Sequence, residues 1–178
     1  RSQKANKEKT AMAQKALQLI QDGQVIFLDV STSMTLLAGM LNKEVTVYSH
    51  SLDNAIQLSS HSQVDIHLLG GKFYPKNRFY YDANQAQILD NLRFDLAFFG
   101  ASSLANGEVT FEDAEDVAVK SLVFEQTRTK VLVAESAKFH QHANYYLARL
   151  QQFDYWITDQ KPSPEILKLV GSETTILY

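Results

Sequence analysis

Short unbroken runs of apolar residues alternate along the chain with longer stretches in which apolar residues recur every three or four positions. The unbroken runs predict strands buried on both faces, because a half-buried strand would alternate apolar and polar residues. Strands are predicted at Val25–Leu28, Val45–Tyr48, Val64–Leu69, Leu96–Phe99, Val131–Val133, Trp156–Thr158 and Thr174–Leu177.

The stretches between these runs have the helical period. Helices are predicted at Lys4–Asp22, Met34–Leu41, Leu52–Leu58, Ala83–Leu92, Ala114–Glu125, Ala143–Leu150 and Pro164–Val170. Strands that alternate with helices form βαβ units, so the fold class is α/β: a three-layer, doubly wound, mostly parallel sheet. Residues 1–22 are expected to form an N-terminal helix or linker that packs on one α/β domain over residues 23–178.

Composition narrows the class of partner. The 178 residues include 17 Lys and Arg against 20 Asp and Glu, a net charge of −3, so direct DNA binding by this chain is not expected. The absence of Cys excludes disulfide scaffolds and thiolate metal sites, and it agrees with a reducing cytoplasm. No run approaches the roughly 18 apolar residues of a membrane span. We therefore expect a cytoplasmic domain with no membrane partner.

Polar residues gather where the predicted strands end. Small, hydroxylic or charged residues follow six of the strands, at positions 29–33, 49–51, 70–71, 100–103, 135–138 and 158–159. Each turn taken alone is also typical of ordinary caps and turns. Because open α/β sheets bind ligands outside the carboxyl ends of their strands, the six together favour a shared polar site at one edge of the sheet.

The strongest local signal is Ser31-Thr32-Ser33, which leads into a predicted helix. Hydroxyls and unpaired N–H groups at a helix N-terminus favour an anion such as phosphate, although simple N-capping by Ser31 or Thr32 explains the same residues. A third interpretation is metal binding, because Asp29-x-Ser31-x-Ser33 resembles the D-x-S-x-S site of von Willebrand A domains, where oxygen ligands hold Mg²⁺. We predict no metal and no cofactor.

Charged residues later in the chain are open to two interpretations. The cluster Glu112, Asp113, Glu115 and Asp116 is typical of a helix start. Asp116 lies four residues before Lys120, so the two share a helix face. They form either a surface ion pair of little consequence or a charged pair that faces the site.

Taken in order, these segments resemble the C-terminal effector-binding domain of DeoR-family transcriptional regulators over nearly the whole chain. The segments are Asp29-x-Ser31-Thr32-Ser33, Ser49-His50-Ser51, Gly70-Gly71, Gly100-Ala101-Ser102, Asp116-x-x-x-Lys120, Glu135-Ser136-Ala137-Lys138 and Ile157-Thr158-Asp159. The resemblance implies a fold similar to ribose-5-phosphate isomerase and the CoA-transferases. It also implies a phosphorylated sugar as effector, operator DNA bound by a winged helix-turn-helix domain before Arg1, and a homo-oligomer. Lactose phosphotransferase repressors are the branch that it most resembles.

The resemblance and the strand ends together give a set of candidate effector-binding residues. They are Asp29, Ser31, Thr32, Ser33, His50, Ser51, Gly70, Gly71, Gly100, Ala101, Ser102, Asp116, Lys120, Glu135 and Lys138. The three hydroxyl residues would bind the phosphate and the two lysines would add positive charge. Asp116, Glu135 and His50 would bind sugar hydroxyls.

The chain also departs from the family pattern. Ser31 replaces the usual Gly, His50 the usual Asn and Glu135 the usual Asp, and Asp82 stands at a position usually held by Gly. Asp82 would repel a phosphate if it faced the site. These departures bear on which effector fits.

An isomerase acting on sugar phosphates is the alternative function. Asp116 or Glu135 could serve as the base, and Lys120 or Lys138 could stabilise an enediolate. Because the resemblance is to the regulators, we expect a sensor domain without catalytic activity.

Overall fold

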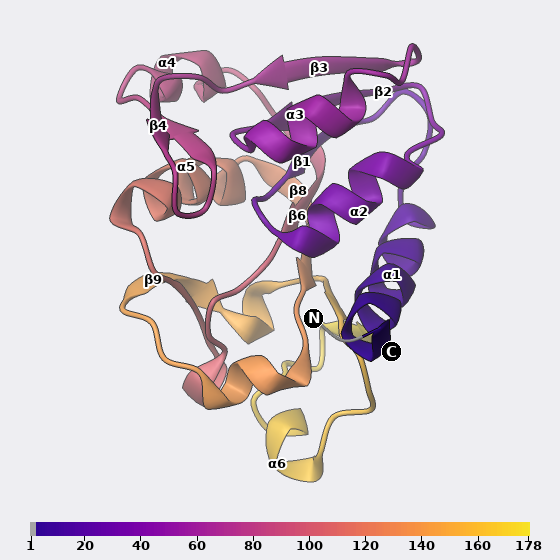
Figure 1. Ribbon diagram of the computed structural model, residues 1–178. Coiled ribbons are helices and arrows are strands. Elements are labelled where there is room, and N and C mark those ends of the chain that lie inside the picture. Colours follow the sequence, from indigo (N-terminus) through magenta and orange to yellow (C-terminus); the bar gives the residue numbers. More distant parts are fainter. Residues whose placement is uncertain (1–2) are drawn as a thin grey trace.

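The computed structural model describes residues 3–178, and its core is one parallel sheet (Figure 1). The strands are β1 (Val25–Leu28), β2 (Val45–Ser49), β3 (Val64–Leu68), β6 (Phe94–Phe99), β8 (Thr127–Val133), β10 (Tyr155–Ile157) and β11 (Thr175–Leu177). Their order is β11-β10-β8-β6-β1-β2-β3, and each neighbouring pair is parallel. The chain builds outward from β1 to one edge and then returns to β6, so the order reverses between β1 and β6. Ligand sites of such sheets lie at this reversal.

Helices cover both faces of the sheet, which confirms the three-layer α/β fold (Figure 1). One face packs against α1 (Gln3–Leu17), α2 (Thr32–Met40) and α3 (Leu52–Leu58), and the other against α4 (Gln85–Leu89), α5 (Ala114–Glu125) and α6 (Pro164–Leu167). Successive residues of β1 serve opposite faces, with Ile26 and Leu28 in one core and Phe27 in the other. This double burial is the reason that the strands read as unbroken apolar runs.

Two antiparallel pairs flank the main sheet. β4 (Lys72–Tyr74) pairs with β5 (Phe79–Tyr81), and β7 (Glu108–Phe111) pairs with β9 (Tyr145–Arg149). Three short 3₁₀ turns, η1 (Ala105–Gly107), η2 (Ser136–His140) and η3 (Leu150–Gln152), complete the elements. The predicted helix over Ala143–Leu150 is therefore wrong. Its short apolar stretch does not define a period, and pairing with β7 decides in favour of a strand.

Several helix ends also differ from the prediction. The first helix ends at Leu17 rather than Asp22, and the last ends at Leu167 rather than Val170. After Leu17 the chain turns, and Gly23 adopts a left-handed φ of +86° while its N–H bonds to the carbonyl of Glu44. Met12, Ala13 and Ala16 are buried where α1 packs on α2. Within residues 3–178, each helix is too short or too polar to cross a bilayer.

Candidate functional site

A polar cleft with a volume of about 420 Å³ opens beside the carboxyl ends of β1 and β6, where the strand order reverses. The turn after β1, the turn after β6, the start of α5 and the turn η2 form its walls. Among the residues predicted for the site, Ser31, Thr32, Ala101, Ser102, Asp116, Lys120 and Lys138 line it. The structure thus brings together segments that are far apart in the sequence.

Asp29 is fully buried at the end of β1 and ties this strand to its neighbour β6. Its Oδ2 accepts the N–H of Gly100 at 2.9 Å, and its Oδ1 accepts the N–H of Val30 at 2.6 Å. The same Oδ1 lies 2.9 Å from the Nζ of Lys120. Asp29 therefore holds a buried cation beneath the cleft.

Lys120 lies between two carboxylates on the inner face of α5. Its Nζ is 2.9 Å from Asp29 Oδ1 and 2.5 Å from Asp116 Oδ2, and it lies 3.4 Å from the centre of the Phe111 ring. The side chain is only 1% exposed. An ammonium group this deeply buried needs such partners to remain charged. The Asp116–Lys120 pair therefore faces the site and is not a surface ion pair.

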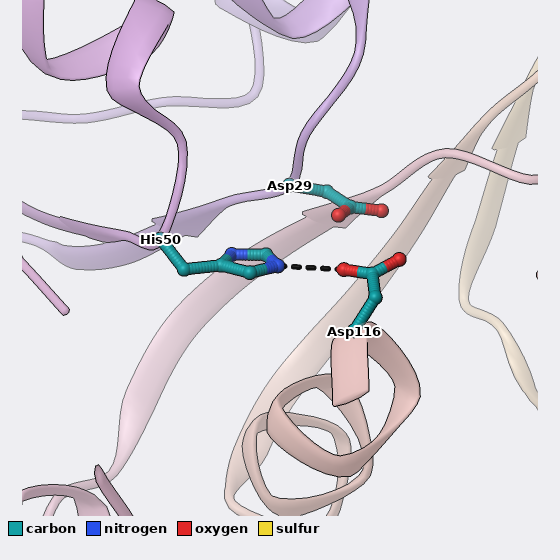
Figure 2. Close-up of side chains that lie close together, drawn as sticks. All are labelled: Asp29, His50 and Asp116. Atoms are coloured by element: carbon teal, nitrogen blue, oxygen red, sulfur yellow. Dashed lines mark hydrogen bonds and ion pairs between the residues drawn. The ribbon is translucent and has the colours of Figure 1, made fainter. Parts of the chain in front are cut away.

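His50 comes from the end of β2 and binds the other side of Asp116 (Figure 2). Its Nε2 lies 2.6 Å from Asp116 Oδ1, and its ring stacks on Phe27 with the edge of Phe79 beside it. The ring is fully buried and does not line the cleft. Within residues 3–178, its Nδ1 has no hydrogen-bond partner. His50 is placed to position Asp116 rather than to touch a ligand.

The two carboxylates have different pKa shifts. Burial raises the pKa of Asp29 above its usual value, and the charge of Lys120 only partly offsets this. Burial also acts to raise the pKa of Asp116, but the charge of Lys120 and the bonds from His50 and Lys120 hold that pKa below its usual value. Asp116 therefore remains ionised at neutral pH and fixes the ammonium beneath the cleft.

The D-x-S-x-S interpretation does not fit this geometry. Ligand atoms of Asp29, His50 and Asp116 do lie within 4.8 Å of one another (Figure 2). However, the ammonium of Lys120 bonds to both carboxylates and so takes the place that a cation would need. Ser31 is also engaged, since its Oγ accepts the N–H of Met34 at 3.1 Å.

Ser31 is the N-cap of α2, so the capping interpretation of this residue is confirmed. The cap leaves the N–H groups of Thr32 and Ser33, in the first turn, without a partner inside the helix. Thr32 is exposed and lines the cleft, whereas the side chain of Ser33 is buried. The positive end of the helix dipole therefore lies at the cleft.

Other predicted residues lie outside the cleft lining: Asp29, Ser33, His50, Ser51, Gly70, Gly71, Gly100 and Glu135. Ser51 caps α3, and the two glycines lead into the β4–β5 pair. The end of β10 opens on a separate cleft, lined in part by Asp159, and the turn after β8 contributes Ser136 to this cleft and Lys138 to the first one. The six strand ends thus do not form a single cavity. The carboxylate of Asp82 accepts the N–H of Asn84 in the following turn, and Asp82 also lies outside the cleft lining.

Four polar residues that the sequence reasoning missed also line the cleft: Asn77, Glu112, Asp113 and Gln141. The sequence pattern around Glu112 and Asp113 indicates only the start of a helix. Asn77 and Gln141 do not lie at the end of a predicted strand, so the pattern did not indicate them. Asn54 was also missed. Its buried amide donates to the carbonyl of Asp29 at 2.9 Å and accepts from Thr35 at 2.9 Å, which locks the turn after β1.

The chain is similar in sequence to known proteins over most of its length. A family model described as the DeoR C terminal sensor domain matches residues 4–160. The chain is 30% identical over 93% of its length to the HTH-type transcriptional repressor GlcR of Bacillus subtilis, of which it spans 64%. It is 31% identical over 96% of its length to the lactose phosphotransferase system repressor of Lactococcus lactis, of which it spans 69%.

Solved structures share the fold at low sequence identity. Ribose 5-phosphate isomerase A from Methanocaldococcus jannaschii aligns over 75% of this chain and 54% of its own, with a TM-score of 0.54 and 16% identity. The 4-hydroxybutyrate CoA-transferase from Porphyromonas gingivalis aligns over 85% of this chain and 39% of its own, with a TM-score of 0.55 and 10% identity. These likenesses confirm the predicted relation to both folds.

Proposed function

Since the chain belongs to the family of DeoR C-terminal sensor domains, we propose that it is the ligand-sensing part of a transcriptional repressor and that its effector is a phosphorylated sugar. Both relatives described above are named as repressors, and one is named for a lactose phosphotransferase system. Binding of operator DNA would fall to a winged helix-turn-helix outside this chain. Such a role would place the protein in the cytoplasm.

The observation that carries the proposal is that one cation of the cleft is still available to a ligand. The charge of Lys120 is already matched by Asp29 and Asp116. Lys138 also lines the cleft, and within residues 3–178 it forms no ion pair. A phosphate would meet Lys138, the hydroxyl of Thr32 and the first-turn N–H groups of α2, a combination suited to an anion.

The remaining polar lining suits the hydroxyl groups of a sugar. The carboxylates of Asp113 and Asp116 can accept hydrogen bonds from hydroxyls, and Asn77, whose amide already donates to Asp113 at 2.9 Å, keeps its carbonyl oxygen and a second N–H for a ligand. Glu112 also lines the cleft and pairs with Lys76 at 3.2 Å. Since carboxylates outnumber the lysines of the lining, a ligand with a second strongly anionic group would be disfavoured. A sugar with a single phosphate would place its one anionic group at Lys138 and its hydroxyl groups at the carboxylates.

Regulation would follow from a difference in affinity between two states of the repressor. A ligand shifts an equilibrium only as far as its affinity for the two states differs. The cleft is formed by the ends of β1 and β6, α5 and η2, so a bound ligand would bridge all of these segments. We expect ligand binding to tighten these segments against one another.

Thermal unfolding with a ligand panel tests the proposal. Hexose 6-phosphates and ribose 5-phosphate are compared with the parent sugars and with inorganic phosphate. A binding sugar phosphate at a hundredfold excess over Kd should stabilise the chain by about 2.7 kcal/mol, and its parent sugar should not. Lys138→Met should remove the shift without changing the melting temperature of the free protein. Lys161→Met, in the separate cleft, is the matched control. A panel in which no phosphorylated sugar shifts the melting curve would contradict the proposal.

A sugar-phosphate isomerase is the second candidate, because a carboxylate and an ammonium lie together at the cleft. Asp116 and Lys120 could act as base and electrophile. Their engagement with each other, with His50 and with Asp29 favours a structural role instead. Incubation of the chain with each sugar phosphate in D₂O, followed by NMR, distinguishes the two functions. Solvent deuterium incorporated next to the carbonyl, and lost in Asp116→Asn, would favour the enzyme.

A further inference from the structure

The edge strand β3 lacks several of the features that usually protect a sheet edge, and Asp65 is its one carboxylate. It is the last strand of the sheet on its side and keeps a regular register with β2 over Val64–Leu68 (Figure 1). It contains no Lys, no Pro and no bulge, which are three of the devices that prevent edge-to-edge pairing. The opposite edge, β11, is only three residues long. β3 is therefore the edge that is open to another strand.

The main chain of β3 presents hydrogen-bonding groups to the outside. The N–H of Leu69 bonds to the carbonyl of Ser49 at 2.8 Å, so the odd-numbered residues of this segment face β2. Since main-chain direction alternates along a strand, the N–H and C=O groups of Ile66 and Leu68 point away from the sheet. These are the groups that a further strand would bind.

The side chains of β3 divide between the two faces of the sheet. Ile66 packs against the core on the face covered by α3, and Leu68 points to the same face but is 39% exposed. Asp65 and His67 lie on the other face, 3.1 Å apart, with side chains 70% and 44% exposed. The strand thus presents a carboxylate and an imidazole, two positions apart, around Ile66, and the imidazole also stacks on Tyr48 of β2.

We propose that β3 pairs in antiparallel fashion with β3 of a second copy of this chain, about a two-fold axis at Ile66. Ile66 would then face its own copy and exchange both main-chain hydrogen bonds with it. Asp65 of each copy would lie opposite His67 of the other, in a non-hydrogen-bonded pair where side chains approach most closely. Val64 would oppose Leu68, an apolar pair. A strand that is complementary to itself in hydrogen-bonding side chains and in apolar character is what a two-fold interface requires.

The pairing would also draw exposed apolar side chains toward the interface. Ile56 on α3 is 58% exposed, and α3 packs against β3 (Figure 1). In the dimer, the two copies of α3 would flank the axis on the face that carries Leu68. The β3 residues do not line the cleft, so this surface is separate from the proposed ligand site.

Disulfide trapping tests the proposal on the chain itself, because the sequence contains no Cys. Asp65→Cys and His67→Cys are prepared separately, and one of them carries a size tag. In the proposed register these two positions lie directly opposite each other, within reach of a disulfide. Two copies of position 65 would be diagonal neighbours, at the limit of that reach or beyond it, and the same holds for two copies of position 67.

We expect the mixture to form a cross-linked dimer of the two variants under mild oxidation at least tenfold faster than either variant alone. Equal rates in all three samples, or no cross-linked product, would overturn the proposal.

A charge exchange gives an independent test, in which sedimentation measures the fraction of dimer. Asp65→Arg should weaken the dimer, and Asp65→Arg combined with His67→Glu should restore it. Failure of the double variant to recover would also overturn the register. Both positions are exposed, and unchanged melting curves would show that the variants fold.

Discussion

The Nζ of Lys120 lies 2.9 Å from the Oδ1 of Asp29, although the two residues are far apart in the sequence. This contact joins the end of the central strand β1 to the inner face of α5, and the 2.5 Å contact with Asp116 completes it. Both ends of the contact are buried, at 1% and 0% exposure of the side chains. The charge beneath the cleft is therefore part of the framework of the domain.

Lys120→Met should destabilise the chain by about 3–5 kcal/mol, because it leaves two buried carboxylates without their cation. Urea unfolding at neutral pH measures this as a lower midpoint. Lys138→Met is the matched control, since Lys138 forms no ion pair within residues 3–178. It should change the free energy of unfolding by less than about 0.5 kcal/mol. Equal effects of the two substitutions would contradict the framework role of Lys120.

The lowered pKa of Asp116 predicts a pH-dependent effect of its neutral analogue. A carboxyl group whose folded-state pKa lies below the unfolded value adds stability above the unfolded pKa, and this stability is lost as the pH falls through the folded value. Asp116→Asn should therefore cost about 1–3 kcal/mol at pH 7. The difference from the parent chain should shrink as the pH falls below about 4, because the unfolded parent then binds a proton at this position and the folded parent does so only at lower pH.

Urea unfolding of both proteins between pH 7 and pH 3 makes this measurement. The raised pKa of Asp29 acts with the opposite sign, since protonation of that group relieves a buried charge. Comparing the variant with its parent at each pH removes most of this contribution, because Asp29 is present in both. A difference that grows toward acid pH would contradict the assignment for Asp116.

Two substitutions at Ser31 separate its capping role from ligand binding. Ser31→Ala removes the side-chain bond to the N–H of Met34 and should cost about 0.5–2 kcal/mol. Ser31→Asp keeps a capping oxygen and favours the helix dipole, so its stability should stay close to that of the parent. Its added negative charge at the cleft should abolish the stabilisation by a sugar phosphate. Thermal unfolding with and without ligand tests both, and a full ligand response in Ser31→Asp would place the phosphate elsewhere.

The main elements could be predicted because double burial leaves a strong pattern. The bounds of β1, α3 and α5 match the prediction, and each has an unbroken apolar run or a clear helical period. β9 could not be found in this way, since its partner β7 is distant in the sequence and decides its conformation. Long-range pairing of this kind has no local signature.

The sequence predicted several of the residues that gather at the site, but it could not predict which of them are buried. Because ligands bind outside the carboxyl ends of parallel strands, Ser31, Thr32 and Ser102 were expected to lie together. They line one cleft with Asp116 and Lys120. It could not show that Asp29 and His50 lie beneath the surface, since burial depends on how α5 packs over the strand ends. Asn54 lies within α3 and binds the turn after β1, so its position in the sequence gave no indication that it belongs to the site.

The adjacent glycines Gly70 and Gly71 should respond differently to alanine. Gly71 has a φ of +135°, and a Cβ there would lie 2.5 Å from the carbonyl oxygen of Tyr81. Gly70 has no such φ, and a Cβ there would meet nothing within 4 Å. Gly71→Ala should therefore cost at least about 2 kcal/mol, from backbone strain and the clash together, whereas Gly70→Ala should be neutral or stabilising by up to about 1 kcal/mol.

Chemical unfolding of the two variants measures this difference, and ligand-dependent melting adds a second test. The resemblance to the regulator family implies that these glycines contact the effector, whereas the structure places them at the entry to the β4–β5 pair, outside the cleft lining. If they serve only the turn, Gly70→Ala should keep the full response to a sugar phosphate. A Gly70→Ala variant that is stable but no longer responds would instead extend the ligand site to this turn, because there an added methyl group could act only on the ligand.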